Sequence, residues 1–371
     1  MSLLAAGKGK RLRPLTYLYP KPTIPLAGIS LLEYYLLLLS RLGVDEIKIV
    51  VGHLSNKIVR HVKSSKVPSL RLDFINQSEQ LGTGHAVSLL RESVGEESFL
   101  LIYSDVFIRA EDLKRLLQTG LSSEFDHVVA VARVDEPWKF GVVLEESGLL
   151  KGIIEKPPKG TEPSNKVIAG AFYFNSSIFS YIEELSKSPR GEYELTDAIQ
   201  EAARRGERVG VLDLRGGWTD AGTFSNLLEA SQLLFQELAS EKLYLDLKLP
   251  YREGMFGPGI RELYPEVSME GPVFIGENVK IGRGSIIGPY TVLYRDIVIE
   301  EGSRISNSII LREVSVKRGS IIEGSIIGDR CYIGKEVRLK RKPKKGEFGM
   351  VLGKAVHIDD FTEVSPGTVW A

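Results

Sequence analysis

The start of the chain combines small residues with cations in a pattern that suits phosphate groups. A short apolar strand runs into glycines and then into basic residues, in the order Leu4-Ala5-Ala6-Gly7-Lys8-Gly9-Lys10-Arg11. Small side chains let backbone N–H groups approach a triphosphate closely, and the guanidinium of Arg11 can answer its charge. Lys21, which precedes Pro22, places a second cation near the same loop. On these residues alone, a triphosphate-binding loop and a tight turn with solvated cations are equally good interpretations.

Two familiar nucleotide-binding motifs are excluded for this loop. Leu12 stands where a dinucleotide fingerprint has its third glycine, and the Gly-Lys-Ser/Thr ending of a P-loop is missing. Phosphate binding here therefore requires a loop of another kind.

A second segment carries side-chain amides just before a glycine turn. It reads Gln77-Ser78-Glu79-Gln80-Leu81-Gly82-Thr83-Gly84-His85, and the turn is expected to open a helix. The amides of Gln77 and Gln80 each carry a donor and an acceptor, which is the pairing needed to read the edge of a base. His85 is expected to cap or pack rather than to catalyse.

Two aspartates stand where chemistry is expected in an α/β protein. Asp105 follows the apolar strand 99–103, and Asp220 lies in Trp218-Thr219-Asp220-Ala221-Gly222-Thr223, just before a helix. In open α/β sheets, ligands bind beyond the carboxyl ends of the strands. An aspartate before a helix is often only a local hydrogen-bonding residue, so Asp220 by itself does not indicate a site.

Short apolar runs alternate with helical patterns over the first 240 residues. Strands are expected at 47–51, 70–75, 99–103, 127–133, 168–174 and 209–214. Helices are expected at 31–42, 57–64, 85–91, 110–118, 176–185, 195–205 and 223–237. This alternation predicts an α/β fold with a Rossmann-like, mostly parallel sheet and helices on both faces.

The sequence period changes to six residues near residue 275. Apolar residues recur in phase at Ile275, Ile281, Ile287, Leu293, Ile299, Ile305 and Leu311, and after a slip of one residue the series resumes at Val316, Ile322, Ile327, Ile333 and Leu339. A repeat of this kind predicts a parallel β-helix in which three hexads form one triangular coil. It resembles the hexapeptide left-handed β-helix.

The two periods predict two domains, an α/β domain at 1–240 and a β-helix domain at 263–371. The connection at 241–262 carries Pro250, Gly254, Gly257, Pro258 and Gly259. The basic run at 340–345 interrupts the β-helix repeat, and we expect it to form a projecting, solvated loop.

The composition is that of an ordinary globular protein without a charge bias. The 371 residues include 48 Lys and Arg and 48 Asp and Glu, so nothing overall steers the chain toward nucleic acid. The single cysteine, Cys331, excludes an intrachain disulfide and a cysteine metal cage. There is no signal-peptide pattern and no run of about 18 apolar residues, so we expect a cytoplasmic protein without membrane contact.

In their order along the chain, these motifs resemble the sugar-1-phosphate nucleotidyltransferases, which include glucose-1-phosphate thymidylyltransferases and N-acetylglucosamine-1-phosphate uridylyltransferases. The match covers essentially all of residues 3–240, and the hexapeptide tail is similar to that of bifunctional members. Three further motifs carry the resemblance: Phe140-Gly141-Val142-Val143, Glu155-Lys156-Pro157 and Gly191-Glu192-Tyr193-Glu194-Leu195-Thr196-Asp197. The resemblance implies that a nucleoside triphosphate, dTTP or UTP, reacts with glucose-1-phosphate or N-acetylglucosamine-1-phosphate and that pyrophosphate leaves.

The resemblance also implies roles for individual residues. Nucleotide binding falls to Leu4, Ala5, Ala6, Gly7, Gly9, Gln77, Gln80, Gly82 and Thr83, of which the last four contact the base. Sugar-phosphate binding falls to Gly141, Glu155 and Lys156. Catalysis falls to Arg11, Lys21, Asp105 and Asp220, and the two aspartates hold Mg²⁺. No general base and no covalent intermediate are expected, because the attacking phosphate oxygen is already anionic.

Departures from the family's pattern leave the base and the sugar open. Lys10 replaces the usual threonine of the first loop. The segment Ile168-Ala169-Gly170 lacks an asparagine that some uridylyltransferases use for the sugar, which favours the thymidylyltransferases. The segment Gln80-Leu81-Gly82-Thr83-Gly84-His85-Ala86 is closer to the uridylyltransferases.

Three other functions remain as alternatives. The β-helix could also acetylate an amino-sugar phosphate, as in bifunctional relatives, but the tail has a histidine only at His357 and carries Arg318 about where that chemistry needs one. A non-catalytic regulatory homologue is disfavoured because Asp105, Asp220 and Lys156 are kept. Guanylyl or adenylyl transfer is disfavoured by the amide-rich base segment.

We expect a homo-oligomer, because the flat sheets and open end of a β-helix need neighbours or caps. Related tails associate through these faces, commonly as trimers. A chain that ends near Ser240 is then expected to be monomeric and to keep some nucleotidyl transfer.

Overall fold

The computed structural model describes residues 1–65, 70–252, 254–262 and 266–371. By their contacts, these residues form two compact units that alternate along the chain. The first comprises Met1–Gly7, Leu38–Lys63 and Pro68–Trp218, and the second comprises Lys8–Leu37, Ser64–Val67 and Thr219–Ala371. The division runs across the predicted domain 1–240, because the segments 8–37 and 219–240 cluster with the C-terminal residues.

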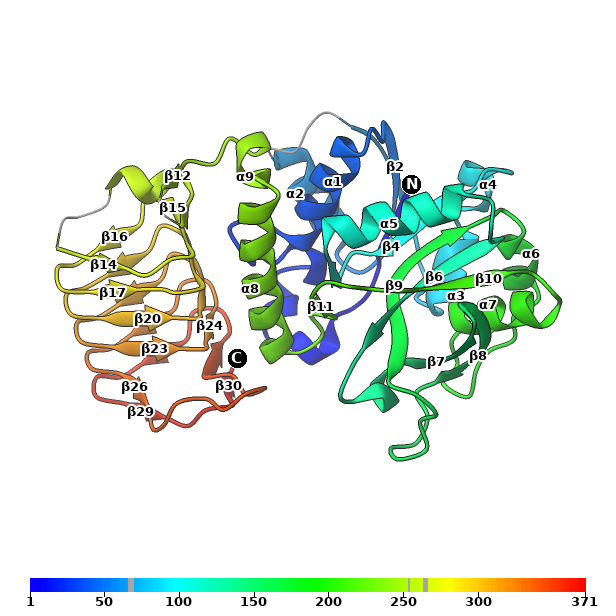
Figure 1. Ribbon diagram of the computed structural model, residues 1–371. Helices are drawn as coiled ribbons and strands as arrows, with labels where there is room; N and C mark the ends of the chain where they lie inside the picture. Colours follow the sequence, from blue (N-terminus) through cyan, green and yellow to red (C-terminus); the bar gives the residue numbers. More distant parts are fainter. Residues whose placement is uncertain (66–69, 253, 263–265) are drawn as a thin grey trace. The chain divides into compact units, whose positions relative to one another are not determined.

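The first unit is built on one sheet in the order β3-β2-β1-β4-β9-β6-β10-β8-β7 (Figure 1). Its strands are β1 Ser2–Ala5, β2 Glu46–Val51, β3 Arg71–Asn76, β4 Phe99–Tyr103, β6 His127–Arg133, β7 Gly141–Glu146, β8 Leu149–Glu155, β9 Lys166–Phe174 and β10 Val209–Asp213. All of the strands expected between residues 47 and 214 are present, and β4 and β6 have the expected bounds.

Parallel and antiparallel pairs share this sheet. The strands β3, β2, β1 and β4 are parallel to one another, and β6 is parallel to β10. Between them β9 runs antiparallel to both β4 and β6, and the hairpin of β7 and β8 continues antiparallel beyond β10. The expected parallel sheet is therefore found at β3 to β4, while the other half is mixed.

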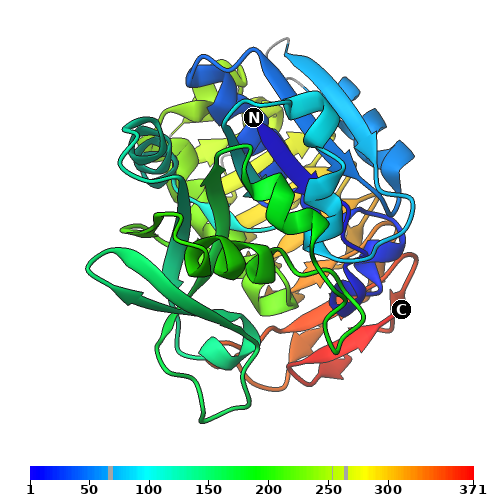
Figure 2. The same ribbon diagram turned by 90° about the vertical axis from the view of Figure 1, so that its right-hand side faces the viewer.

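Helices cover both faces of this sheet (Figure 2). They are α2 Ser55–Ser64, α3 Thr83–Ser88, α4 Arg91–Val94, α5 Ala110–Leu121, α6 Ile178–Glu183 and α7 Leu195–Arg204. On one face, the Tyr173 ring of β9 occupies the space that a Cβ on Gly120 of α5 would need. The adjacent Phe172 and Phe174 point to the other face and join the core that α6 and α7 share.

The second unit contains a stack of short parallel strands that fits a parallel β-helix (Figure 1). One sheet holds β12 Tyr251–Arg252, β13 Met255–Phe256, β15 Val273–Glu277, β18 Thr291–Arg295, β21 Ile309–Arg312, β24 Ile326–Ile327, β27 Met350–Leu352 and β30 Thr368–Trp370. A second holds β14 Ser268–Met269, β17 Ile286–Ile287, β20 Arg304–Ser306 and β23 Ile321–Glu323, and the pair β26 Arg338–Leu339 and β29 Glu363–Val364 forms a sheet of its own. Another holds β16 Lys280–Ile281, β19 Val298–Ile299, β22 Ser315–Val316, β25 Tyr332–Ile333 and β28 His357–Ile358.

Burial and strand register fit the six-residue spacing and correct its phase at one point. The repeated positions from Ile275 to Ile305 lie in one buried cluster. Leu293 pairs with Ile310, and Ile310 belongs to that cluster. The prediction that Leu311 points into the coil is therefore wrong. The interval between inward residues that is one residue short lies between Ile305 and Ile310, and not, as predicted, between Leu311 and Val316. Leu311 is buried on the outer side of the strand.

Small polar residues stack inside the coils beside these apolar positions. Ser285, Ser303 and Ser320 are fully buried. Ser303 N–H donates to Ser285 Oγ at 3.3 Å, and Val337 N–H donates to Ser320 Oγ at 3.3 Å. These bonds satisfy backbone groups at the corners of the coils, where hydroxyls compensate for their burial.

The basic run at 340–345 lies between β26 and β27 and lengthens one coil, so that Ile327 pairs with Leu352. Its basic side chains are exposed, as expected of a solvated loop.

The remaining elements are three α-helices, two short strands and five short 3-10 helices. They are α1 Leu31–Arg41, α8 Phe224–Ser240, α9 Leu243–Asp246, β5 Phe107–Ile108, β11 Trp218–Thr219, η1 Lys10–Leu12, η2 Leu15–Tyr17, η3 Lys21–Thr23, η4 Pro137–Lys139 and η5 Pro258–Glu262. Glu33 accepts from the N–H and hydroxyl of Ser30 at 2.8 Å, and Glu33 N–H donates back to Ser30 Oγ, so a capping box opens α1. Within the described ranges, no helix has both the length and the apolar character needed to cross a membrane.

Candidate functional site

The second unit begins with the basic half of the first loop. Gly9 has a φ of 60°, which favours glycine, and a Cβ there would lie 2.9 Å from the Thr16 methyl group. Thr16 Oγ1 donates to the Gly9 carbonyl at 2.9 Å. These contacts fix the base of the turn η1, from which Arg11 projects with 68% of its side chain exposed.

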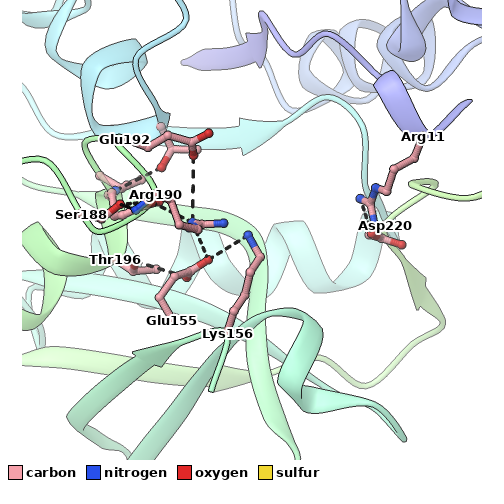
Figure 3. A network of polar contacts seen from close by, with 11 residues as sticks. Arg11, Glu155, Lys156, Ser188, Arg190, Glu192, Thr196 and Asp220 are labelled. Carbon is pink, nitrogen blue, oxygen red and sulfur yellow. Dashed lines mark hydrogen bonds and ion pairs between the residues drawn. The ribbon is translucent and has the colours of Figure 1, made fainter. Parts of the chain in front are cut away.

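Arg11 and Asp220 come together in this unit (Figure 3), and Lys21 joins them. Arg11 Nη2 lies 3.7 Å from Asp220 Oδ2, and Lys21 Nζ donates to the Asp220 backbone carbonyl at 2.9 Å. Asn226 Nδ2 donates to Asp220 Oδ1, and 15% of the Asp220 side chain is exposed. The structure thus places three of the predicted catalytic residues in one cluster.

Gly222 permits this close approach. A Cβ on Gly222 would lie 2.6 Å from Arg11 Nη2 and 2.6 Å from Asp220 Oδ2. Such contacts are shorter than side chains tolerate, so any larger residue displaces one of the two charged groups.

In the first unit, the small residues after β1 meet the amide segment at Gly52. A Cβ on Gly52 would lie 3.0 Å from the Ala6 carbonyl oxygen and 3.0 Å from Gln80 Nε2. Leu4 and Ala5 belong to β1, and a Cβ on Gly7 would meet nothing within 4 Å. The backbone after β1 therefore faces open space at the carboxyl edge of the sheet, with the Gln80 amide beside it.

The side-chain oxygen of Gln80 is an unusual feature of this edge. Gln80 Oε1 is buried and has no hydrogen-bond partner in the part of the chain that the structure describes. A buried acceptor without a donor costs about 1–3 kcal/mol. A ligand that brings an N–H group to Gln80 removes that cost.

The other residues of the amide segment hold its shape. Gln77 Nε2 donates to the Gly82 carbonyl at 3.2 Å and lies 3.1 Å from His85 Nδ1. His85 therefore packs against Gln77, as expected. Thr83 Oγ1 accepts from the N–H of Leu195, which opens α7. Gly82 has a φ of 115°, a backbone conformation that favours glycine.

Glu155 is the centre of a charged network in the same unit (Figure 3). Its Oε1 lies 3.2 Å from Lys156 Nζ and accepts from Arg190 Nη2 at 3.1 Å. Thr196 Oγ1 donates to its Oε2 at 3.4 Å. Gly141 faces Glu155 across the hairpin, and a Cβ there would come within 2.9 Å of Glu155 Oε2. The three predicted sugar-phosphate residues therefore lie together.

Arg190 belongs to this network, although the motifs do not single it out. Its Nη2 donates to Glu194 Oε1 at 2.7 Å and lies 4.0 Å from Glu192 Oε2. Glu194 is 4% exposed and also accepts from Ser188 Oγ at 3.0 Å. The signal for Arg190 is its place directly before Gly191, at the edge of a motif whose buried carboxylate needs a cation.

Charge in this network is concentrated near the start of α7. Burial raises the pKa of Asp197 above its usual value, and the carboxylates of Glu194 and Glu155 raise it further. Lys156 has a φ of 47° and leaves 45% of its side chain exposed. Lys156 is therefore a cation that an anionic ligand can reach from solvent.

Asp105 leaves the sheet at the carboxyl end of β4. The buried Ser104 donates to the Leu4 carbonyl from its N–H at 3.0 Å and from its hydroxyl at 2.6 Å, which ties this end of β4 to β1. Asp105 itself is half-buried. Burial raises the pKa of Tyr103 well above its usual value, so its hydroxyl stays protonated beside Thr83.

The chain matches the family model described as nucleotidyl transferase over residues 2–237 and the one described as GMPPB C-terminal domain over residues 269–371. It is 33% identical over 339 residues to a glucose-1-phosphate thymidylyltransferase of Streptomyces griseus, covering 89% of this chain and 92% of that protein. The chain belongs to the sugar-1-phosphate nucleotidyltransferase family. This nucleotidyltransferase is also 33% identical over 400 residues to the bifunctional protein GlmU of Methanocaldococcus jannaschii, covering 98% of this chain and 90% of that protein.

Solved structures share the fold over a part of the chain. A putative glucose-1-phosphate thymidylyltransferase from Bacillus anthracis, in complex with a sucrose, is similar with a TM-score of 0.57 at 27% identity, covering 62% of this chain and 93% of that chain. A UDP-glucose pyrophosphorylase complexed with UDP-glucose shares the fold with a TM-score of 0.57 at 23% identity, covering 64% of this chain and 98% of that chain.

Proposed function

We propose that this nucleotidyltransferase joins dTTP or UTP to glucose-1-phosphate or N-acetylglucosamine-1-phosphate and releases pyrophosphate. The observation that carries the proposal is at Gly52, where the backbone of Ala6 and the amide of Gln80 lie side by side. A nucleotide presents phosphates and a base within one molecule, so it requires these two features next to each other.

The base preference rests on the unpartnered oxygen of Gln80. Uracil and thymine share an N3–H donor flanked by carbonyl acceptors, and a side-chain amide can pair with both kinds of group. Adenine has an acceptor at the corresponding ring nitrogen but carries an amino donor beside it, so a side-chain amide can also pair with adenine. The test below therefore includes ATP. Guanine also carries an N–H beside a carbonyl, so GTP is included in the test below.

The chain's own residues bring two polyanions together and neutralise them. A phosphate oxygen of the sugar phosphate attacks the α-phosphorus in line, the bond to the β-phosphate breaks, and pyrophosphate leaves. Arg11 and Lys21 bind the triphosphate, while Lys156 and Arg190 bind the sugar phosphate. Positioning and charge stabilisation are sufficient, because the nucleophile needs no proton removed.

Mg²⁺ fits the carboxylates of this chain. Mg²⁺ usually takes one or two carboxylates together with substrate phosphates, rather than an all-protein cage. Among the described residues, no group of three or more His, Cys, Asp or Glu side chains is placed to hold a metal. Asp105 and Asp220 would hold the ion, and when bound it supplies neutralising charge for the phosphates.

The test is a matrix of pyrophosphate release. Glucose-1-phosphate, N-acetylglucosamine-1-phosphate, galactose-1-phosphate and mannose-1-phosphate are each combined with dTTP, UTP, CTP, GTP and ATP, with and without Mg²⁺. Release with dTTP or UTP and one of the first two sugars supports the proposal. If well-folded protein releases no pyrophosphate with any pair, the proposal is contradicted. Release with GTP alone would change the proposed base to guanine.

Replacing Lys156 by alanine is expected to raise the KM for the sugar phosphate by about tenfold or more, because a charge-assisted hydrogen bond contributes about 1.5–3 kcal/mol. The KM for the triphosphate should stay within about twofold. Lys159→Ala is the matched control, since Lys159 is also exposed but contacts the Trp138 ring at 4.7 Å. Equal behaviour of the two variants in steady-state kinetics would remove Lys156 from the site.

Gly222→Ala is expected to lower kcat by about tenfold, because the added Cβ displaces Arg11 or Asp220, and a shift of ~1 Å can cost up to about a hundredfold. Gly152→Ala is the control, since a Cβ there would meet Leu144 at 3.8 Å, an ordinary contact. Initial rates of pyrophosphate release compare the two. A Gly222→Ala enzyme with full activity would show that the spacing of Arg11 and Asp220 is not needed for turnover.

We further propose that residues 1–240 form the nucleotidyltransferase domain, 241–262 the connection, and 263–371 a left-handed β-helix that associates into trimers. The parallel stack and the six-residue repeat support the β-helix. Val298 and Ile321 stand on two outer faces of the stack and are 43% and 42% exposed. Light scattering on the full chain is expected to show a trimer or a multiple of it, and a monomer would contradict this proposal.

A further inference from the structure

Within the second unit, hydrogen bonds join the segment that carries Arg11 and Lys21 to the β-helix. The Tyr19 hydroxyl donates to both carboxylate oxygens of Asp329, at 2.8 and 3.0 Å, across a sequence separation of 310 residues. Asp329 follows β24, in the corner before β25. Neither Tyr19 nor Asp329 has a part in the reaction proposed above.

This contact is enclosed by neighbouring groups of the same unit. The Arg312 guanidinium carbon lies 5.9 Å from the centre of the Tyr19 ring and 5.3 Å from that of Tyr294. The backbone N–H of Arg312 donates to Asp329 Oδ1 at 3.2 Å. Burial raises the pKa of Tyr19 far above its usual value, and the Asp329 carboxylate adds to the shift. The hydroxyl therefore remains a donor at every ordinary pH.

Two more contacts join the β-helix to the residues around the Arg11 cluster. A Cβ on Gly353 would lie 3.0 Å from Pro14 Cγ, so the backbone after β27 packs directly on Pro14. The Phe348 ring packs edge-on against Phe224, with ring centres 5.2 Å apart, at the first residue of α8. The tail thus touches the chain shortly after Arg11 and shortly after Asp220.

We propose that Tyr19 and Asp329 are positioning residues for nucleotidyl transfer, through which the β-helix holds Arg11 and Lys21 in place for the triphosphate. The inference rests on the proposed function and deepens it. Lys21 follows Tyr19 by two residues, and its bond to the Asp220 carbonyl requires a fixed backbone at that point. A hydrogen bond to a charged partner is strong enough to set that position.

The arrangement makes the expected effect specific to one substrate. Glu155, Lys156 and Arg190 belong to the first unit and have no part in the Tyr19 contact. Loss of the Tyr19–Asp329 contact, the anchor of this segment, should therefore raise the KM for the triphosphate and leave the KM for the sugar phosphate unchanged. A residue that only stabilised the fold would affect both substrates together.

The experiment compares full-length wild type with Tyr19→Phe, Asp329→Asn and the double variant. Steady-state kinetics vary each substrate in turn, and amide hydrogen exchange is followed over residues 8–23. Tyr19→Phe is expected to raise the KM for the triphosphate by about tenfold, the scale of one hydrogen bond to a charged group. The KM for the sugar phosphate should stay within twofold, and exchange over 8–23 should quicken. Asp329→Asn keeps an acceptor oxygen and should lie between wild type and Tyr19→Phe.

Tyr332→Phe is the matched control. Tyr332 stands on β25 and stacks on His357 at 4.4 Å between ring centres, so it tests loss of a tyrosine hydroxyl from another face of the same β-helix. It should leave both KM values and the exchange of 8–23 unchanged.

The outcomes separate this inference from the proposed function. A wild-type chain that transfers no nucleotide contradicts the proposed function. In that case, amide hydrogen exchange in Tyr19→Phe still reports whether the Tyr19–Asp329 contact orders residues 8–23. An active wild type whose Tyr19→Phe variant keeps its triphosphate KM contradicts the positioning role alone. Equal shifts in both KM values, with a lower Tm and unchanged exchange over 8–23, would make Tyr19 a residue of general stability and would also overturn it.

Discussion

Asp105→Asn and Asp220→Asn are each expected to lower kcat by roughly 10²–10³-fold, the scale of losing one preorganised electrostatic element. Amides keep the size of the carboxylates and lose the charge that holds a divalent cation against phosphates. For Asp220, Asn can still accept from Asn226 through its remaining oxygen, so the local structure should survive. The free energy of unfolding is expected to change by less than about 1 kcal/mol in either variant.

Asp112→Asn is the matched control for these two variants. Asp112 is 2% exposed and accepts from Arg115 Nη1 at 2.7 Å, from Arg215 N–H at 3.0 Å and from Gly216 N–H at 2.8 Å. Loss of the Asp112 carboxylate should lower the free energy of unfolding by about 1.5–3 kcal/mol, because these are hydrogen bonds to a charged group. The kcat should hold.

Stopped assays of pyrophosphate release and thermal melts on the same preparations separate the two patterns. An Asp105 or Asp220 variant that melts early but keeps its specific activity would be a structural carboxylate like Asp112. Titration with Mg²⁺ adds a second readout, since a variant that has lost a metal ligand should need more of the ion to reach half its maximal rate.

The sequence predicts the elements whose signal is local. The strands 99–103 and 127–133 each contain a continuous apolar run, and β4 and β6 have those bounds. The hairpin of β7 and β8 is missed, because Leu144 and Ile154 are partly exposed and charged residues follow in β7. A hairpin at the edge of a sheet, with one face exposed to solvent, lacks the long apolar run that marks a buried strand.

The phase error in the β-helix has a similar cause. Ile309, Ile310 and Leu311 are all fully buried and all apolar, so the sequence offers three candidates for one inward position. Strand register decides among them, since Leu293 pairs with Ile310. Burial on both faces of a strand removes the alternation from which the inward side could be read.

The motifs single out residues that lie near one another in the structure, but they give no sign of the contacts that support them. Gly141, Glu155 and Lys156 lie together as the resemblance implies, whereas Arg190 emerges from its bonds to Glu155 and Glu194. The anchor between Tyr19 and Asp329 joins residues 310 positions apart. Neither residue carries a motif, so spacing and residue type give no sign of such a contact.

The contacts within the second unit change what is expected of a chain that ends at Ser240. The Phe235 ring of α8 packs against Phe256 and Tyr290, with ring centres 6.0 and 6.5 Å apart. Gln232 lies on the same helix, and its Nε2 donates to Asn307 Oδ1 at 2.7 Å. The Phe274 ring occupies the place that a Cβ on Gly28 would need. Truncation at Ser240 removes every one of these partners.

The truncated chain is therefore expected to be severely destabilised rather than simply monomeric. Each large apolar side chain returned to water costs about 1.5–3 kcal/mol, and the side chains that lose partners include Phe235 and Phe224, which packs on Phe348. A loss of about 5 kcal/mol or more matches the whole stability of many domains. Urea unfolding and light scattering on the truncated and full-length chains measure this loss, and aggregation of the truncated chain is the expected result.

A substituted truncation separates stability from positioning. Replacing Phe235 by serine in the truncated chain makes the uncovered helix face more polar and should recover part of the solubility. Activity should stay low even then, because the anchor at Asp329 and the packing of Gly353 on Pro14 are gone. A truncated chain that is soluble, monomeric and fully active would show instead that residues 1–240 hold Arg11 and Lys21 without the β-helix.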